Sequence, residues 1–308
     1  MASIRARLLF DLIMPVMGMK QRYMPPLDGE VLLRRRRRPG APPAGAQISS
    51  FRGRDIVHVP AGEARQPAPL LYLHGGAFVN PITPHHWRLI SELAQRTQSS
   101  CDVALYPLAP EQQLDDIIDF VEALWTQRYA RQPPIVVADS AGTLLALRLA
   151  QTLRDAGQPQ PAALVLISPC LDITFGDPRS RPLDARDPML ALSGLPAVSR
   201  VVAGTRDPDD PSLNPLLCGL TDLPPMLVLA AGRDVLWPDA MRLVEGVQAA
   251  GGEVTLMEEA EMVHVWPVMP IPEAREARAA IAAFVMQHLS ASAPVAAPAP
   301  LTSSLPGS

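Results

Sequence analysis

Short apolar runs alternate with longer amphipathic stretches along most of the chain. The apolar runs predict strands at residues 54–59, 69–74, 101–106, 134–138, 163–168, 226–231 and 253–258. Several of them lack polar alternation, which is typical of strands covered on both faces of a parallel sheet. The intervening stretches predict helices near residues 84–98, 113–130, 141–156, 236–250 and 273–289. The pattern therefore predicts an α/β fold with a mostly parallel central sheet flanked by helices.

Two segments interrupt this alternation. Residues 1–45 contain an apolar run followed by five arginines, and residues 171–215 are long and rich in Pro and Asp. Segments of that length inside a compact domain are usually functional insertions, so we expect both to cap the carboxyl edge of the sheet. The predicted organisation is an N-terminal cap segment (1–45), a catalytic domain (46–290) and a tail (291–308) that is uncharged, Pro-rich and disordered.

The apolar run at residues 8–18 follows Arg5 and Arg7, as the core of a signal peptide would. Asp11 interrupts the run, however, and no small-residue cleavage site follows it. The run is also shorter than the ~20 apolar residues that span a bilayer, so we expect no stable membrane insertion. It predicts a cap helix that lies on the domain, with contact to a membrane surface as the alternative.

Composition narrows the functional classes. Of the 308 residues, 48% are apolar, which is enough for a sizeable core, and the net charge of −4 argues against a general affinity for nucleic acid. The run Arg34–Arg38 is therefore expected to be a solvated turn. Three cysteines without a C-x-x-C spacing favour neither a disulfide framework nor a zinc site, and they indicate a cytoplasmic protein.

The segment from Ile135 to Ala150 has the sequence of a nucleophile elbow. An apolar strand runs into Ala138-Asp139-Ser140-Ala141-Gly142, and a helix follows at once. In such an elbow a serine sits on a tight strand-to-helix turn, with small residues two positions away on either side. The helix N-terminus would also favour negative charge beside Ser140. The alternative is that Ser140 only caps the helix.

A glycine-rich loop follows the strand at 69–73, with the sequence His74-Gly75-Gly76-Ala77-Phe78. Such a loop can point backbone amides at a developing oxyanion, together with the amide after the nucleophile. We expect the amides of Gly76, Ala77 and Ala141 to do so. If position 77 needs a positive φ, its alanine costs ~1 kcal/mol. The alternative is an ordinary Gly-Gly turn.

The sequence offers few candidates for the general base and for the acid that orients it. The chain has six histidines, and His264 lies in a loop after the last predicted strand, where this kind of fold supplies its base. Asp234 follows the strand at 226–231 and is the expected acid, since working side chains lie at the carboxyl ends of strands. Asp239 is the alternative acid.

These pieces resemble the hormone-sensitive-lipase-like branch of the α/β-hydrolases, with its many bacterial carboxylesterases. The matching motifs are HGGAF at 74–78, YPLAPE at 106–111, DSAG at 139–142, RDVLWPDA at 233–240 and MVHVWP at 262–267. The resemblance covers roughly residues 50–290. It implies hydrolysis of small carboxylic esters with no cofactor or metal. It also supports Ser140, Asp234 and His264 as the triad. The oxyanion residues that it implies are Gly75, Gly76, Ala77 and Ala141. The family usually has Gly at Ala77, Ala138 and Thr143.

The expected function is therefore acyl transfer through an acyl-enzyme, with a small-molecule ester of short or medium acyl length as substrate. Two alternatives are a lactonase or acyltransferase with the same triad, and a ligand receptor without catalysis. Monomer and homodimer both remain open. Apolar residues near the expected site loops could line the substrate pocket: Phe78, Trp237, Val263, Trp266, Met189 and Leu190.

Overall fold

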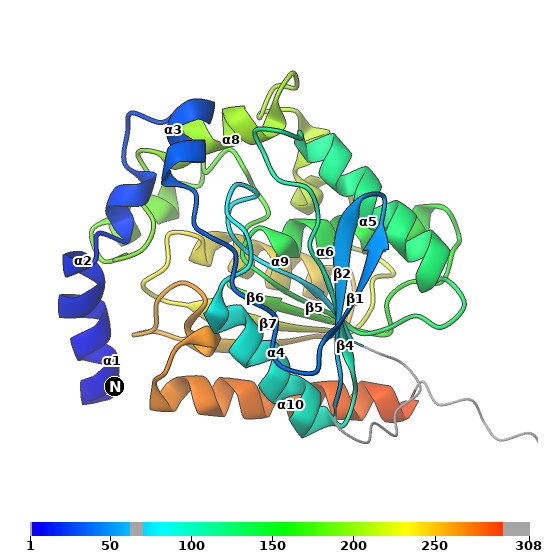
Figure 1. The fold of residues 1–308 in the computed structure, drawn as a ribbon. Helices are drawn as coiled ribbons and strands as arrows, with labels where there is room; N and C mark the ends of the chain where they lie inside the picture. Colours follow the sequence, from blue (N-terminus) through cyan, green and yellow to red (C-terminus); the bar gives the residue numbers. More distant parts are fainter. Residues whose placement is uncertain (1, 62–69, 292–308) are drawn as a thin grey trace, which may run out of the picture.

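The computed structural model describes residues 2–61 and 70–291, in which an eight-stranded sheet runs through the molecule (Figure 1). The strand order is β1-β2-β4-β3-β5-β6-β7-β8. β2 pairs antiparallel with β1 and β4, and every other pair is parallel. The strands are β1 (Gln47–Phe51), β2 (Arg54–Val59), β3 (Leu70–Leu73), β4 (Cys101–Ala104), β5 (Val136–Asp139), β6 (Leu164–Ile167), β7 (Met226–Ala231) and β8 (Val254–Glu259).

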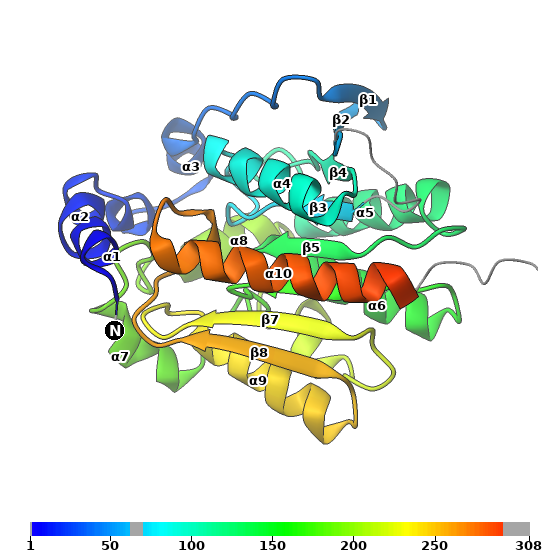
Figure 2. The same cartoon turned by 90° about the horizontal axis from the view of Figure 1, so that it is seen from below.

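Helices cover both faces of the sheet (Figures 1 and 2). One face is covered by α4 (Pro84–Thr97) and α10 (Pro272–Ala291), which pack against each other. The other face is covered by α5 (Leu114–Arg128), α6 (Gly142–Asp155) and α9 (Trp237–Ala249). The predicted α/β class with a mostly parallel sheet is therefore confirmed.

The two hydrophobic cores follow from the period of two along each strand. Val136 and Ala138 of β5 belong to the core under α5, α6 and α9, whereas Val137 belongs to the core under α4 and α10. All three side chains are fully buried. A strand that is buried on both faces needs an apolar residue at every position, which explains the continuous apolar runs of the sequence.

One strand was not predicted from the sequence. β1 reads QISSF, and only Phe51 at its end is buried. The strand lies at the edge of the sheet and faces solvent, so it carries neither a continuous apolar run nor a clear alternation. Polar edge strands of this kind leave little pattern to detect.

The N-terminal apolar run forms a helix that lies on the domain, as predicted. It comprises α1 (Ile4–Leu8), a π-helical stretch (Leu9–Ile13) and α2 (Met14–Val16). Its inward face consists of Ala6, Phe10 and Met14, which join the core under α4 and α10. Among the described residues, no helix combines the length and apolarity that crossing a bilayer requires.

The arginine run is structured rather than a solvated turn. α3 (Gly29–Arg35) contains its first two arginines. The guanidinium of Arg36 donates to the Val79 carbonyl oxygen at 2.8 Å and to the Ala109 carbonyl oxygen, and it forms an ion pair with Glu111 at 2.6 Å. Arg36 thereby connects the N-terminal segment to the loops that follow β3 and β4.

The insertion folds into short helices over the carboxyl ends of the strands. It contains α7 (Arg181–Asp184), α8 (Leu195–Ala203) and three-residue 3₁₀ turns. Parallel pairing places Leu73 of β3 beside Ala138 of β5, so the loops after these strands emerge together beneath α8. The tail predicted for residues 291–308 lies outside the described residues from 292 onward.

The packing of α10 predicts a large effect of core truncation. Ile281 is fully buried against the sheet, so Ile281→Ala should lower the free energy of unfolding by about 2–5 kcal/mol through lost contacts and a cavity. Ile48→Ala, at an exposed position of β1, should change it by less than about 0.5 kcal/mol. Urea unfolding followed by circular dichroism measures both. Equal effects of the two substitutions would contradict this account of the core.

Candidate active site

Ser140 lies at a sharp turn between β5 and α6. Its φ is +48°, in the left-handed region that is costly for a residue with a side chain. The backbone around it is close-packed: a Cβ added at Gly142 would lie 2.1 Å from the Leu73 carbonyl oxygen. The Ser140 N–H donates to the Ile167 carbonyl oxygen at 2.9 Å, which fixes the turn to β6. No side chain fits at position 142, which explains why the second residue after the serine is a glycine.

His264 and Asp234 lie beside this serine, and the three side chains form a hydrogen-bonded triplet. The His264 Nε2 atom is 2.8 Å from the Ser140 Oγ atom, and its Nδ1 atom is 2.7 Å from the Asp234 Oδ2 atom. A carboxylate only accepts hydrogen bonds, so Nδ1 carries a proton and the Nε2 lone pair faces the hydroxyl. All three side chains are buried. The structure thus brings together the three residues that sequence reasoning chose.

The electrostatics of His264 follow from its neighbours. Burial alone would lower the pKa of His264, because the charged form loses hydration. The negative charge and hydrogen bond of Asp234 outweigh burial, and the pKa lies above its ordinary value of 6.5. Asp234 therefore stabilises a protonated imidazole at this position.

Two further hydrogen bonds hold the loops that carry the triplet. The Val265 N–H donates to the Ser168 Oγ atom at 2.9 Å, which ties the His264 loop to the end of β6. The Leu236 N–H donates to the Asp234 Oδ1 atom at 2.9 Å. Both carboxylate oxygens of Asp234 are thus engaged, and the orientation of its side chain is fixed.

The glycine-rich loop after β3 lies beside Ser140. Gly76, Ala77 and Phe78 have φ values of +129°, +54° and +58°. Ala77 does adopt a positive φ, at a cost of about 1 kcal/mol. Among the described residues, the N–H groups of Gly76, Ala77 and Ala141 have no hydrogen-bond acceptor. These amides remain available for a ligand oxygen.

The expectation that the Gly75 amide serves the oxyanion is wrong, because its N–H already has an acceptor. It donates to the Asp139 Oδ1 atom at 2.9 Å and so cannot serve an oxyanion. A Cβ added at Gly75 would lie 2.2 Å from the Asp139 Oδ2 atom and 2.8 Å from the Ser140 Cβ atom. Gly75 is therefore needed for close packing of the loop against the serine.

Asp139 was missed by sequence reasoning as a functional position. The Tyr72 hydroxyl donates to its Oδ1 atom at 2.8 Å, and the His86 Nε2 atom lies 3.2 Å from its Oδ2 atom. His86 Nδ1 accepts the Thr83 N–H, so the ring N–H on the other nitrogen, Nε2, points at Asp139. Burial alone would raise the pKa of Asp139, but His86 and these hydrogen bonds lower it. A buried carboxylate thus fixes the loop beside Ser140.

The YPLAPE motif supports the loop from its other side. The Tyr106 ring stacks on His74 with centroids 4.4 Å apart, and its hydroxyl donates to the His74 carbonyl oxygen. Burial lowers the pKa of His74 to about 4, so this imidazole is neutral near pH 7. His74 therefore has a packing role in the loop.

A narrow apolar cavity opens next to the serine. Its volume is about 30 Å³, which is room for only a few water-sized atoms. Ser140, Ala77, Phe78 and Ala141 line one part of it, and the rest of the lining comes from Cys170, from the insertion and from Leu236. These other lining residues are Cys170, Ile173, Phe175, Leu190, Leu195, Val198, Ser199, Val202 and Leu236.

The predicted pocket residues divide into two groups. Phe78 and Leu190 line the cavity, but Trp237 and Val263 do not. The Trp237 indole N–H donates to the Glu258 Oε1 atom at 2.8 Å, and Val263 is fully buried in the core under α4 and α10. Met189 and Trp266 also lie outside the lining. Adjacency in sequence to Asp234 or His264 was a poor guide, because the insertion supplies the walls.

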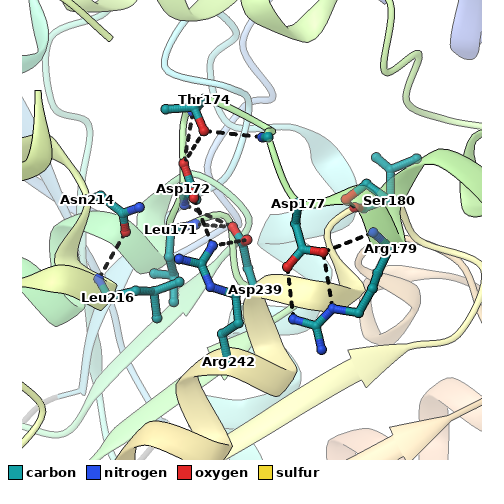
Figure 3. Close-up of polar contacts among 12 residues, drawn as sticks. Leu171, Asp172, Thr174, Asp177, Arg179, Ser180, Asn214, Leu216, Asp239 and Arg242 are labelled. Atoms are coloured by element: carbon teal, nitrogen blue, oxygen red, sulfur yellow. Dashed lines mark hydrogen bonds and ion pairs between the residues drawn. The ribbon is translucent and has the colours of Figure 1, made fainter. Parts of the chain in front are cut away.

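Asp239, the alternative acid, has a different role. Its Oδ2 atom accepts the N–H groups of Leu171 and Asp172 at 2.8 and 2.9 Å, and Arg242 forms an ion pair with Asp172 at 2.7 Å (Figure 3). Burial raises the pKa of Asp239 to about 7, although the two backbone hydrogen bonds oppose the shift. Asp239 thus anchors the start of the insertion to α9.

Asp187 is a second buried carboxylate that the sequence did not single out. It accepts the N–H groups of Met189, Leu190 and Val235 at 2.7, 2.9 and 3.1 Å. Burial and the neighbouring charge of Asp234 raise the pKa of Asp187 to about 6. It joins the cavity wall at Leu190 to the turn that follows Asp234. One Asp among many in the insertion carries no pattern that marks this role.

The chain is similar in sequence to known proteins. A model of the alpha/beta hydrolase fold family matches residues 70–268. An esterase of Acinetobacter venetianus is 31% identical over 249 residues, which cover 77% of this chain and 80% of the relative. An acetyl-hydrolase of Streptomyces hygroscopicus is 35% identical over 225 residues, which cover 70% of this chain and 74% of the relative.

Solved structures share the fold. A putative esterase from Staphylococcus aureus superimposes with a TM-score of 0.73 and 26% identity, over 78% of this chain and 82% of its own. An esterase from the bacterial hormone-sensitive lipase family superimposes with a TM-score of 0.76, over 94% of this chain and all of its own. Its identity of 24% supports the fold alone.

The electrostatic account of His264 can be tested by substituting its carboxylate partner. Asp234→Asn removes the charge that raises the pKa of His264 and leaves the burial that lowers it, so the pKa should fall. Titration of the imidazole signals by NMR measures the change, with His264→Gln to assign the resonance. Asp102→Asn removes the carboxylate beside His58 and should leave His264 unchanged. An unchanged His264 pKa in Asp234→Asn would contradict the assignment.

Proposed function

The chain belongs to the α/β-hydrolase fold family, among the hormone-sensitive-lipase-like carboxylesterases that its motifs indicate, and we propose that it hydrolyses small or medium acyl esters through an acyl-enzyme. In this proposal Ser140 is the nucleophile, His264 the general base and Asp234 the orienting acid. The single observation that carries it is the 2.8 Å contact between His264 Nε2 and Ser140 Oγ. Ala77 and Ala141 line the same cavity as Ser140, and within the described part of the chain their N–H groups have no acceptor.

Acylation is the first step. The Ser140 Oγ atom bonds to the ester carbonyl carbon while its proton passes to His264 Nε2. The carbon–oxygen bond to the alcohol then breaks, and the alkoxide leaves with the proton from His264. Asp234 keeps Nδ1 protonated and stabilises the imidazolium without accepting its proton.

Deacylation follows the same order of steps, with water as the nucleophile in place of Ser140. Water attacks the acyl carbon while His264 Nε2 takes its proton, and the Ser140 Oγ atom regains that proton as the acid leaves. In both steps the negative charge on the tetrahedral carbonyl oxygen would be held by the amides of Gly76, Ala77 and Ala141. Fixed donors need no reorganisation as charge develops, which is a large source of rate enhancement.

Two other functions use the same site. A lactonase or an acyltransferase would differ only in the ester or the acceptor that the insertion admits, so a product assay with added alcohols separates them from an esterase. A receptor without catalysis needs no base at Ser140. The position of His264 at hydrogen-bond distance favours the hydrolase over the receptor.

Replacing the proposed nucleophile should abolish turnover. Ser140→Ala removes the attacking oxygen, so we expect kcat on p-nitrophenyl butyrate to fall at least about a thousandfold. A spectrophotometric assay of p-nitrophenol release measures it. A fluorophosphonate probe should label the natural chain at Ser140 and not the variant.

A matched control is Ser50→Ala, at an exposed position of β1, which should keep full activity and labelling. Substantial turnover by Ser140→Ala would refute the nucleophile. A chain that neither labels nor hydrolyses a panel of esters would instead support the receptor.

The small cavity supports a preference for short acyl chains. The space beside Ser140 is about 30 Å³, so a long chain would have to displace more of the packed side chains of the insertion than a short one. We expect kcat/KM on p-nitrophenyl acetate or butyrate to exceed that on the palmitate at least about tenfold. Leu195→Ala, in the wall formed by α8, should shift the preference towards longer chains. Better hydrolysis of triglyceride emulsions than of butyrate would contradict this.

A further inference from the structure

The N-terminal helix exposes an apolar ridge to solvent. Of the eleven large apolar side chains exposed in the described residues, six lie between residues 4 and 17, each 39–80% exposed. These six residues are Ile4, Leu8, Leu12, Ile13, Val16 and Met17. Four of them follow at intervals of four residues, which places them along one side of a helix. We call this set the outer ridge.

The opposite face holds the helix in a fixed position. Phe10 is fully buried, and the Arg233 guanidinium lies 5.8 Å from its ring centre. Arg233 also forms an ion pair with Asp11 at 2.7 Å. The Ser3 hydroxyl donates to Glu273 at 3.1 Å. The outer ridge is therefore presented by an anchored helix, and both views place α1 and α2 at the margin of the molecule (Figures 1 and 2).

Charge is distributed unevenly between this region and the rest. Residues 1–38 contain nine of the 27 Lys and Arg but three of the 31 Asp and Glu, so they carry +6 and the remaining residues −10. Arg5 and Arg7 flank the outer ridge, are exposed, and have no acidic partner among the described residues. Asp11 is neutralised by Arg233. An apolar ridge with free cations complements an anionic surface that has an apolar interior.

We propose that the outer ridge docks on the surface of an anionic phospholipid bilayer, with the helix lying in the interface. Apolar side chains that enter the acyl boundary and arginines that meet lipid phosphates are the two elements of such binding. A symmetric contact between two copies is disfavoured, since it would bring Arg5 and Arg7 of one copy against the same two arginines of the other. The proposal does not depend on ester hydrolysis.

Docking through this ridge would orient the site relative to the lipid. Arg233, which holds the helix, precedes Asp234 of the triplet, and its N–H donates to the Met262 carbonyl oxygen at 3.0 Å in the loop that leads to His264. The bound helix would thus lie close to the loops that carry two members of the triplet.

Vesicle sedimentation with the full chain tests the proposal. The protein should pellet with phosphatidylcholine vesicles that contain about 30 mole per cent phosphatidylglycerol, and far less with phosphatidylcholine alone. The double variant Leu12→Ser/Val16→Ser should lower the partition coefficient at least about tenfold, because two exposed apolar side chains no longer enter the bilayer. Arg5→Gln/Arg7→Gln should lower it and weaken its dependence on salt.

The matched control is Ile48→Ser/Leu217→Ser, which removes two apolar side chains that are each 60% exposed elsewhere and should bind like the natural chain. Circular dichroism establishes that each variant is folded. The proposal is overturned if the natural chain stays in the supernatant, or if Leu12→Ser/Val16→Ser binds as well as the control. It is also overturned if sedimentation velocity without lipid shows a dimer that the same variant dissolves, since a second copy would then cover the ridge.

Discussion

The left-handed turn at Ser140 is the constraint on which the rest of the site depends. The serine has a φ of +48° between a strand and a helix, and its hydroxyl lies 2.8 Å from the His264 Nε2 atom. That conformation is costly for the isolated chain and persists because its surroundings determine it: Gly142 lies against the Leu73 carbonyl, and the Ser140 N–H is bound to Ile167. Asp139 extends this support to the neighbouring loop by accepting the Gly75 N–H. One strained residue thus organises two loops.

Much of this arrangement was predictable from the sequence, for identifiable physical reasons. Strands buried on both faces must be apolar throughout, so β3, β5, β6 and β7 stand out as short continuous runs. A tight turn demands small residues, and a glycine-rich loop after a strand is an unusual pattern. The structure brings Ser140, Asp234 and His264 to hydrogen-bond distance, as these patterns predicted, while their catalytic roles remain a proposal.

What the sequence did not reveal depends on tertiary contacts. β1 has a polar edge pattern, and α3 ends among residues that were predicted to form a solvated turn. The cavity walls follow the path of the insertion, which is set by hydrogen bonds that backbone N–H groups donate to the carboxylates of Asp187 and Asp239. Carboxylates that bind amides leave no spacing or period in the sequence. Trp237, three residues after the expected acid, donates to Glu258 of β8 and does not line the cavity.

The attachment of the insertion has a consequence for how such a chain can diversify. The Asp239 carboxylate accepts hydrogen bonds from two backbone amides at the start of the insertion, and Arg242 of the same helix forms an ion pair with Asp172 (Figure 3). These hydrogen bonds come from backbone N–H groups, which do not depend on the side chain. The residues after Asp172 can therefore be exchanged without breaking them. Randomised or transplanted insertions that keep Asp187, which accepts the Val235 N–H in the turn after Asp234, could therefore be joined after Asp172 while Ser140, Asp234 and His264 stay in place. New specificities would then arise by recombination of one segment.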